Sequence, residues 1–142
     1  MAGTLIVSLD FELFWGMLDV CPLEKYQDHV LGGRKAIPGL LALFQKYGIH
    51  ATWATVGYLF ARSAQEAASF FPEEALRPTY DDPALNSYAE FSKIGETEAP
   101  CFFAPSLVEL VAETPGQEIG ATLFPITTAR KRGRRRSSSR RI

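Results

Sequence analysis

A short apolar run, a helical pattern and a second apolar run follow one another at the start of this chain, and that order leaves few folds open. Residues 5–9 (LIVSL) are too few for a helix and suit a strand buried on both faces, as in parallel sheets. Residues 34–46 place apolar side chains at helical spacing, with Pro38 expected in the first turn and Gly48 after the last. Residues 50–56 predict a second strand. This order predicts a right-handed βαβ unit in an α/β fold with a parallel sheet.

The chain continues this alternation less regularly. Residues 58–68 predict a further helix, and residues 105–111 predict another. Between them, residues 71–100 are rich in turn-forming residues and show little periodicity, which is typical of a long excursion from the core. Residues 117–120 predict the start of a third strand. We therefore expect the first two or three strand–helix units of an α/β fold.

Charge divides the chain in two. Residues 1–120 contain 7 Lys and Arg against 16 Asp and Glu, a net charge of −9, whereas residues 121–142 contain 8 basic residues and no acidic one. The second segment has no apolar face and repels itself. We therefore expect residues 1–120 to form the folded domain and residues 121–142 to be a disordered basic tail.

Membrane and export signals are not apparent in the sequence. No stretch approaches the roughly 18 apolar residues that span a bilayer, and the N-terminus lacks the basic segment of a secretory signal. The two cysteines, Cys21 and Cys101, stand alone without metal-ligand spacing. These observations predict a cytoplasmic protein with ordinary thiols.

Two acidic residues follow the first predicted strand directly. In an extended chain Ser8, Asp10 and Glu12 share one face, because side chains alternate. The C-terminal end of a buried parallel strand is where α/β folds keep their active sites. Two carboxylates there could hold a cation, or one could act as a general base. The alternative is a polar strand end that only caps the following turn.

The order of three motifs carries a family resemblance. Residues 8–12 (SLDFE), the helix with Pro38-x-Leu40-Leu41, and residues 51–57 (ATWATVG) together resemble the polysaccharide deacetylase, or NodB-like, family over about residues 3–120. The resemblance implies a distorted (β/α) barrel, here incomplete. It also implies hydrolysis of a carbon–nitrogen bond other than a peptide bond, as in deacetylation of an N-acetylated carbohydrate or a related small amide, with a divalent metal such as zinc.

The acidic motif departs from the usual family pattern. That pattern is T-F-D-D-G, in which the first aspartate is the catalytic base and the second is a metal ligand. Here Phe11 follows Asp10, and the second acid arrives one residue later. The resemblance therefore implies Asp10 as the catalytic base and Glu12 as the metal ligand. Arg34, Asp81 and Asp82 are candidates for substrate contacts.

The histidines that would complete such a metal site are absent from the expected place. The family carries H-[S/T]-x-x-x-H or H-[S/T]-x-x-H after the third strand, and zinc sites need such nitrogens. This chain has only His29 and His50, neither with a partner at metal-ligand spacing. We interpret both as surface or structural residues.

The composition after Gly120 predicts a shifted reading frame. Residues 121–129 read ATLFPITTA. Codons for these residues, read one base earlier, permit Ser (or Gly or Cys)-His-Thr-Phe-Ser-His-Tyr-Tyr-Cys. We therefore interpret the chain as the N-terminal part of a deacetylase-type domain with an out-of-frame tail, inactive as written and with no tightly bound metal. An incomplete barrel would also leave an open sheet edge through which copies could aggregate or oligomerise.

Two other functions remain open from the sequence. The arginine-rich residues 130–141 could bind nucleic acid or another polyanion, although they lack the interleaved aromatic residues that stack on bases. We expect such binding to be without sequence specificity, because the acidic body offers no supporting basic surface. The remaining alternative is a non-catalytic structural relative of the family.

Overall fold

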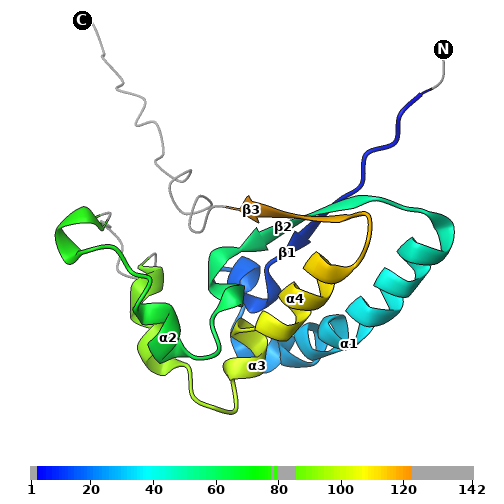
Figure 1. Ribbon diagram of the computed structural model, residues 1–142. Helices are drawn as coiled ribbons and strands as arrows, with labels where there is room; N and C mark the ends of the chain where they lie inside the picture. The colour runs from blue at the N-terminus through cyan, green and yellow to red at the C-terminus, as the bar shows by residue number, and fades with distance from the viewer. Residues whose placement is uncertain (1–2, 78, 80–85, 123–142) are drawn as a thin grey trace, which may run out of the picture.

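Three parallel strands form the centre of the molecule (Figure 1). The computed structural model describes residues 3–77, 79 and 86–122. The strands β1 (Ser8–Phe11), β2 (Ala51–Val56) and β3 (Gln117–Thr122) lie in the order β1-β2-β3. The prediction of an α/β fold with a parallel sheet is confirmed, and the sheet is open in the described residues.

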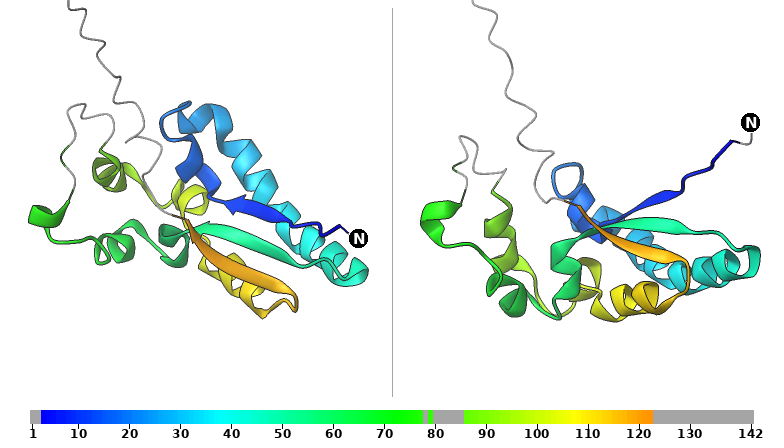
Figure 2. Two further views of the ribbon diagram at one scale, coloured as in Figure 1. Left: turned by 90° about the horizontal axis from the view of Figure 1, so that it is seen from above. Right: turned by 45° about the horizontal axis from the view of Figure 1, so that its top comes forward.

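Helices cover one side of this sheet. The longer ones, α1 (Leu23–Tyr47) and α4 (Pro105–Glu113), lie on the same side of the strands (Figures 1 and 2). The shorter helical segments are η1 (Leu13–Met17), η2 (Gly57–Phe60), α2 (Ala64–Ala68), η3 (Glu74–Leu76), η5 (Ser87–Lys93) and α3 (Ala99–Phe102).

The first strand begins later than the apolar run predicts. Leu5 and Ile6 are 87% and 82% exposed, and the strand starts at Ser8. The expectation of burial on both faces is wrong, since Asp10 is exposed and Phe11 is buried. The physical reason is that helices cover only the Phe11 side of the sheet, so the strand alternates as a half-buried strand does.

Helix α1 is almost twice as long as predicted. It starts at Leu23 instead of residue 34, so Pro38 lies inside the helix and not in its first turn. Val30 and Ile37 are buried on the same stripe. This packing against the core offsets the hydrogen bond that a proline removes from a helix interior. The predicted end is confirmed: Gly48 has a φ of 62°, and its N–H reaches the last carbonyls of the helix.

The segment after β2 is broken into shorter pieces than predicted. In place of one helix over residues 58–68, the chain forms η2 and then α2, whose N-terminus is capped by Ser63 accepting a hydrogen bond from the Glu66 N–H. The described parts of the excursion over residues 71–100 hold short helices packed around aromatic side chains. Phe71 and Phe91 contact each other and Tyr58 at 4.7–5.9 Å between ring centroids.

The described strands form an open sheet, and the predicted incomplete barrel is not shown. Among the described residues β1 and β3 each pair on one side only, with β2. Strand β3 runs to Thr122, two residues past the boundary predicted at residue 120. Residues 123–142, most of the predicted tail, lie outside the described residues.

Candidate functional site

The two predicted site residues lie at the C-terminal edge of the sheet, on the first strand and just beyond it. Asp10 is in β1, and its neighbours in register are Ala54 of β2 and, one strand further, Gly120 of β3. Neither of these neighbours has a side chain larger than a methyl group. Asp10 itself is exposed, on the face of the sheet away from the helices.

Glu12 follows the strand and precedes the 3-10 turn η1. Its side chain is half-buried, and burial raises the pKa of its carboxyl above the ordinary value, with the negative charge of Asp10 adding to the effect. Within the described part of the chain, no donor forms a hydrogen bond or ion pair with this carboxylate. A partly desolvated carboxylate beside a second one is stabilised by a proton or a cation.

The turn after Glu12 has an unusual backbone. Leu13 has a φ of 50°, the one positive value at a residue other than glycine in the described chain. Such a conformation costs on the order of 1–2 kcal/mol for a residue with a Cβ atom and persists only when surrounding contacts enforce it. The turn leads the chain from β1 into η1, which contacts α1 and α3.

Trp15 fixes this turn to the rest of the protein. The indole is 3% exposed, and its Nε1 donates a 2.7 Å hydrogen bond to the main-chain carbonyl of Phe102 in α3. The ring also packs against Phe91, Phe102 and Phe103, with centroid distances of 4.8–6.3 Å. The turn that follows the carboxylate pair is therefore held by contacts with residues far later in the chain, in the range 91–103.

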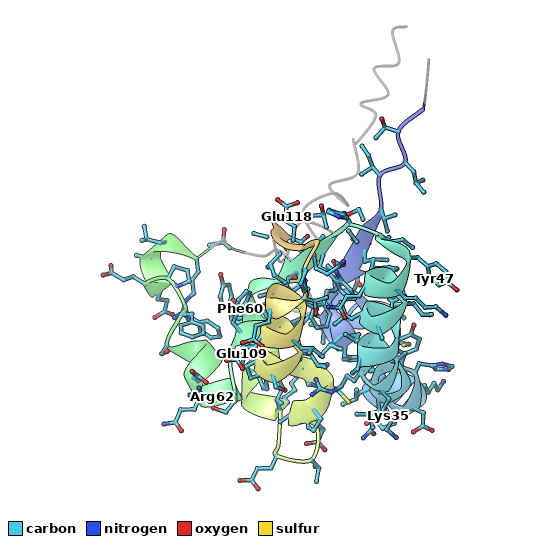
Figure 3. The ribbon with its side chains drawn as sticks, turned by 45° about the vertical axis from the view of Figure 1, so that its right-hand side comes forward. Lys35, Tyr47, Phe60, Arg62, Glu109 and Glu118 are labelled. Atoms are coloured by element: carbon cyan, nitrogen blue, oxygen red, sulfur yellow. The ribbon has the colours of Figure 1, made fainter. Side chains whose placement is uncertain are left out.

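The rest of the open face is polar as well. Thr52 and Glu118 lie near the opposite edge of the sheet, where the Thr52 hydroxyl donates a 2.9 Å hydrogen bond to Glu118 Oε2. Figure 3 shows Glu118 on the side of β3 away from α4. A face lined by hydroxyl, carboxylate and small side chains differs from the apolar layer that packs against α1 and α4.

Arg34, one of the predicted substrate-contact residues, lies within the helical layer. Its Nη1 donates a 2.8 Å hydrogen bond to the carbonyl of Phe103, and burial lowers the pKa of the guanidinium. This contact joins α1 to the segment between α3 and α4. Asp81 and Asp82 lie outside the described residues.

No histidine or cysteine of the described residues joins Asp10 and Glu12 in a group that could hold a metal ion. His50 precedes β2 at the opposite edge of the sheet, next to Gly116, and His29 is exposed on α1, stacked at 5.1 Å on Tyr26. Cys21 and Cys101 are both free thiols, as expected.

A metal fits the described residues only in part. Two carboxylates supply oxygen ligands of the right kind, but no cluster of three or more histidine, cysteine, aspartate or glutamate side chains with metal-binding geometry occurs in residues 3–77, 79 and 86–122. A structural or catalytic zinc site needs at least three protein ligands. The described part of the chain therefore does not complete a metal site.

The local geometry around Glu12 has almost no signature in the sequence. Gly16 stands four residues after it, and that spacing is the one signal that could have pointed to a close approach. The positive φ of Leu13 has no signature at all, because leucine is not a residue that favours it.

Comparison with known proteins identifies no relative of this chain. No family model, no curated protein and no solved structure matches the chain. Among the described helices none is long and apolar enough to cross a membrane. The chemistry of the carboxylate pair and the motif resemblance are therefore the two grounds for a functional proposal.

Proposed function

We propose that residues 1–120 are part of a metal-dependent hydrolase that cleaves carbon–nitrogen bonds other than peptide bonds, with deacetylation of an N-acetylated carbohydrate as the reference reaction. One observation carries the proposal. Asp10 and Glu12 meet at the C-terminal edge of a parallel sheet, and Glu12 is half-buried without a hydrogen-bond donor in the described chain. Parallel sheets place catalytic groups at this edge.

Exposure and burial favour different roles for the two acids. Asp10 is exposed on the open face, where it can take a proton from a water that attacks the acetyl carbonyl and return it to the leaving nitrogen. Glu12 is the more desolvated group, and a cation would relieve both its burial and its repulsion by Asp10. A bound divalent cation would supply Lewis-acid polarisation of the carbonyl oxygen.

The 142-residue chain is expected to lack this activity. Its only histidines, His29 and His50, do not lie at the carboxylate pair. Two carboxylates alone give weak coordination that water competes with easily. The missing nitrogen ligands would come from the paired histidines that the shifted frame permits.

The coding DNA provides the first test. Inserting one base near codon 121 should open a frame that encodes two histidines at the family spacing and continues for a further domain half. A stop codon within a few positions, or a frame without the histidines, would contradict the frame interpretation.

Metal analysis of the frame-restored protein provides the second test. It should retain roughly stoichiometric zinc, cobalt or nickel after dialysis, while the 142-residue chain retains little. Asp10→Asn should keep most of the metal and lose most of the turnover, whereas Glu12→Gln should lower the metal content. The opposite pattern would exchange the two roles. Tight metal binding and hydrolysis by the 142-residue chain would overturn the proposal of an incomplete site.

Charge segregation favours a second candidate function. The domain carries −9 and the last 22 residues carry +8, so residues 121–142 should attract phosphate-rich polymers through charge. This candidate requires no folded site, and the salt dependence of DNA binding distinguishes it from the first.

A further inference from the structure

We propose that Gly16 is a positioning residue for Glu12: its missing side chain is the space in which the Glu12 carboxylate lies. The inference rests on the proposed function, since it assigns how the candidate cation ligand is held. It concerns a residue that the family resemblance does not single out.

The geometry at Gly16 is a close approach of one side chain. A Cβ atom built on Gly16 would overlap Glu12 Oε2 and would lie 3.3 Å from Cδ and 3.5 Å from Cβ of the same glutamate. Three atoms of the Glu12 side chain, from its Cβ to its carboxylate, therefore lie where a side chain at Gly16 would begin. No other residue contributes an atom to the three nearest contacts at that position.

Backbone conformation does not explain the glycine. Positive φ values among the described glycines occur at Gly48 and Gly116 only, so Gly16 has a φ that alanine adopts freely. It lies inside η1, where alanine would lose less conformational entropy than glycine on folding. Space for a neighbouring side chain is the remaining physical reason for a glycine here.

The turn itself is held too firmly to move aside. The main-chain N–H of Trp15 donates a 3.1 Å hydrogen bond to the Glu12 carbonyl, and the buried Trp15 indole is bonded to Phe102. Phe14 is 3% exposed on the same turn and packs edge-on against Phe102 at 5.5 Å. An added methyl group would therefore displace the flexible Glu12 side chain and leave the backbone in place.

Displacement would take Glu12 out of its half-buried position. A Glu12 side chain that moves into solvent would gain conformational freedom and full hydration. A cation held jointly by Asp10 and Glu12 would then lose one of its two carboxylates. Gly16→Ala should thus resemble removal of the Glu12 carboxylate in its effect on cation binding.

The test uses Tb³⁺ alone as the probe, on the full 142-residue chain. Tb³⁺ prefers oxygen ligands, and its emission is sensitised when it is bound close to an aromatic side chain such as the Trp15 indole. Gly16→Ala should raise the apparent Kd by about tenfold, as supporting contacts to a metal ligand commonly do when removed. Gly39→Ala is the matched control, because a Cβ there meets no atom within 4 Å.

A double-mutant cycle separates positioning from general structural damage. In the Glu12→Ala background, Gly16→Ala should not weaken Tb³⁺ binding and should not lower the urea midpoint, since no carboxylate remains to be displaced. In the Glu12 background it should weaken Tb³⁺ binding. Equal Tb³⁺ affinity of Gly16→Ala and the unaltered chain, with Glu12→Ala weakened, would overturn the inference.

The two proposals fail in different ways. If Glu12→Ala leaves Tb³⁺ binding unchanged, Glu12 is not a cation ligand and the proposed function loses its metal-ligand assignment. The positioning inference is then decided by the urea midpoints measured without metal. The inference is supported if the effect of Gly16→Ala on the urea midpoint differs between the Glu12 and the Glu12→Ala backgrounds. It is overturned if the effect is the same in both.

Discussion

At the residue scale, the two indoles donate hydrogen bonds to acceptors of different kinds. Trp15 bonds a buried main-chain carbonyl at 2.7 Å, and Trp53 bonds the Gln117 side-chain oxygen at 3.0 Å. Replacing Trp15 by phenylalanine leaves the Phe102 carbonyl without this donor. Because the carbonyl is buried, it cannot form a hydrogen bond to water instead. We expect a loss of about 1–3 kcal/mol in the free energy of unfolding, beyond the change in ring size.

The matched variant Trp53→Phe should lose less stability. Gln117 is only half-buried, so water can replace the indole at its side-chain oxygen while its Nε2 keeps the 2.9 Å bond to the Ile49 carbonyl. Urea unfolding followed by circular dichroism measures both variants. A smaller loss for Trp15→Phe than for Trp53→Phe would contradict the assignment of Trp15 as the anchor of η1.

Also at the residue scale, Glu12 links stability to pH. Burial, with a contribution from Asp10, raises the pKa of its carboxyl in the folded chain above the ordinary value near 4.5, which applies to the unfolded chain. The folded chain therefore holds the proton longer as pH rises. The stabilising contribution of protonated Glu12 is complete below the ordinary glutamate pKa and is lost as pH rises through the folded-state pKa.

Glu12→Gln should remove the loss of stability that accompanies deprotonation of Glu12 as pH rises. Its free energy of unfolding in EDTA, relative to that of the unaltered chain, should increase from about pH 4 towards neutral pH. Asp10→Asn should reduce the effect without abolishing it, because burial is the larger cause. A difference between Glu12→Gln and the unaltered chain that is constant across this range would refute the raised pKa.

At the element scale, glycines at two positions in and after α1 have opposite roles. Gly39 is exposed inside the helix with free space where a side chain would lie, whereas Gly48 ends the helix at a φ of 62°. Gly39→Ala should stabilise the protein by about 0.5–1 kcal/mol, because alanine loses less backbone entropy in a helix. Gly48→Ala should destabilise it by about 1 kcal/mol, because a Cβ is strained in the left-handed region.

Thermal unfolding of the two variants side by side measures this contrast. The same chemical change is made in both, so differences in side-chain hydrophobicity cancel. Equal shifts of Tm in the same direction would show that the two glycines are not distinguished by backbone conformation.

At the scale of the whole molecule, we expect the opposite charges of residues 1–120 and residues 121–142 to determine how the chain binds polyanions. Eight basic residues in 121–142 can contact phosphates, and the domain repels them with a net charge of −9. The logarithm of the affinity for duplex DNA should fall with the logarithm of salt concentration with a slope of about −7 or shallower. Two unrelated duplexes should bind equally at each salt concentration.

Fluorescence anisotropy with labelled duplexes measures this dependence. Replacing Arg134, Arg135 and Arg136 by glutamine should make the slope shallower by about three, since each contact releases about one counterion. A clear preference for one duplex at physiological salt would instead support a selected nucleic-acid function.

Some of this protein could be read from local sequence because the relevant interactions are local. The order of strand, helix and strand follows from apolar periodicity, and the end of α1 follows from Gly48, whose conformation depends on its own backbone. The location of Asp10 and Glu12 at the C-terminal edge follows from their place directly after an apolar strand in a parallel sheet. These features need no knowledge of distant residues.

Only the tertiary structure decided the boundaries and the shape of the site. Helix α1 starts eleven residues earlier than its local pattern predicts, and β1 is buried on one face, because burial depends on which other elements pack there. The turn that holds Glu12 depends on a bond between Trp15 and Phe102, 87 positions apart. Such contacts form only when the chain is folded, so local periodicity carries no trace of them.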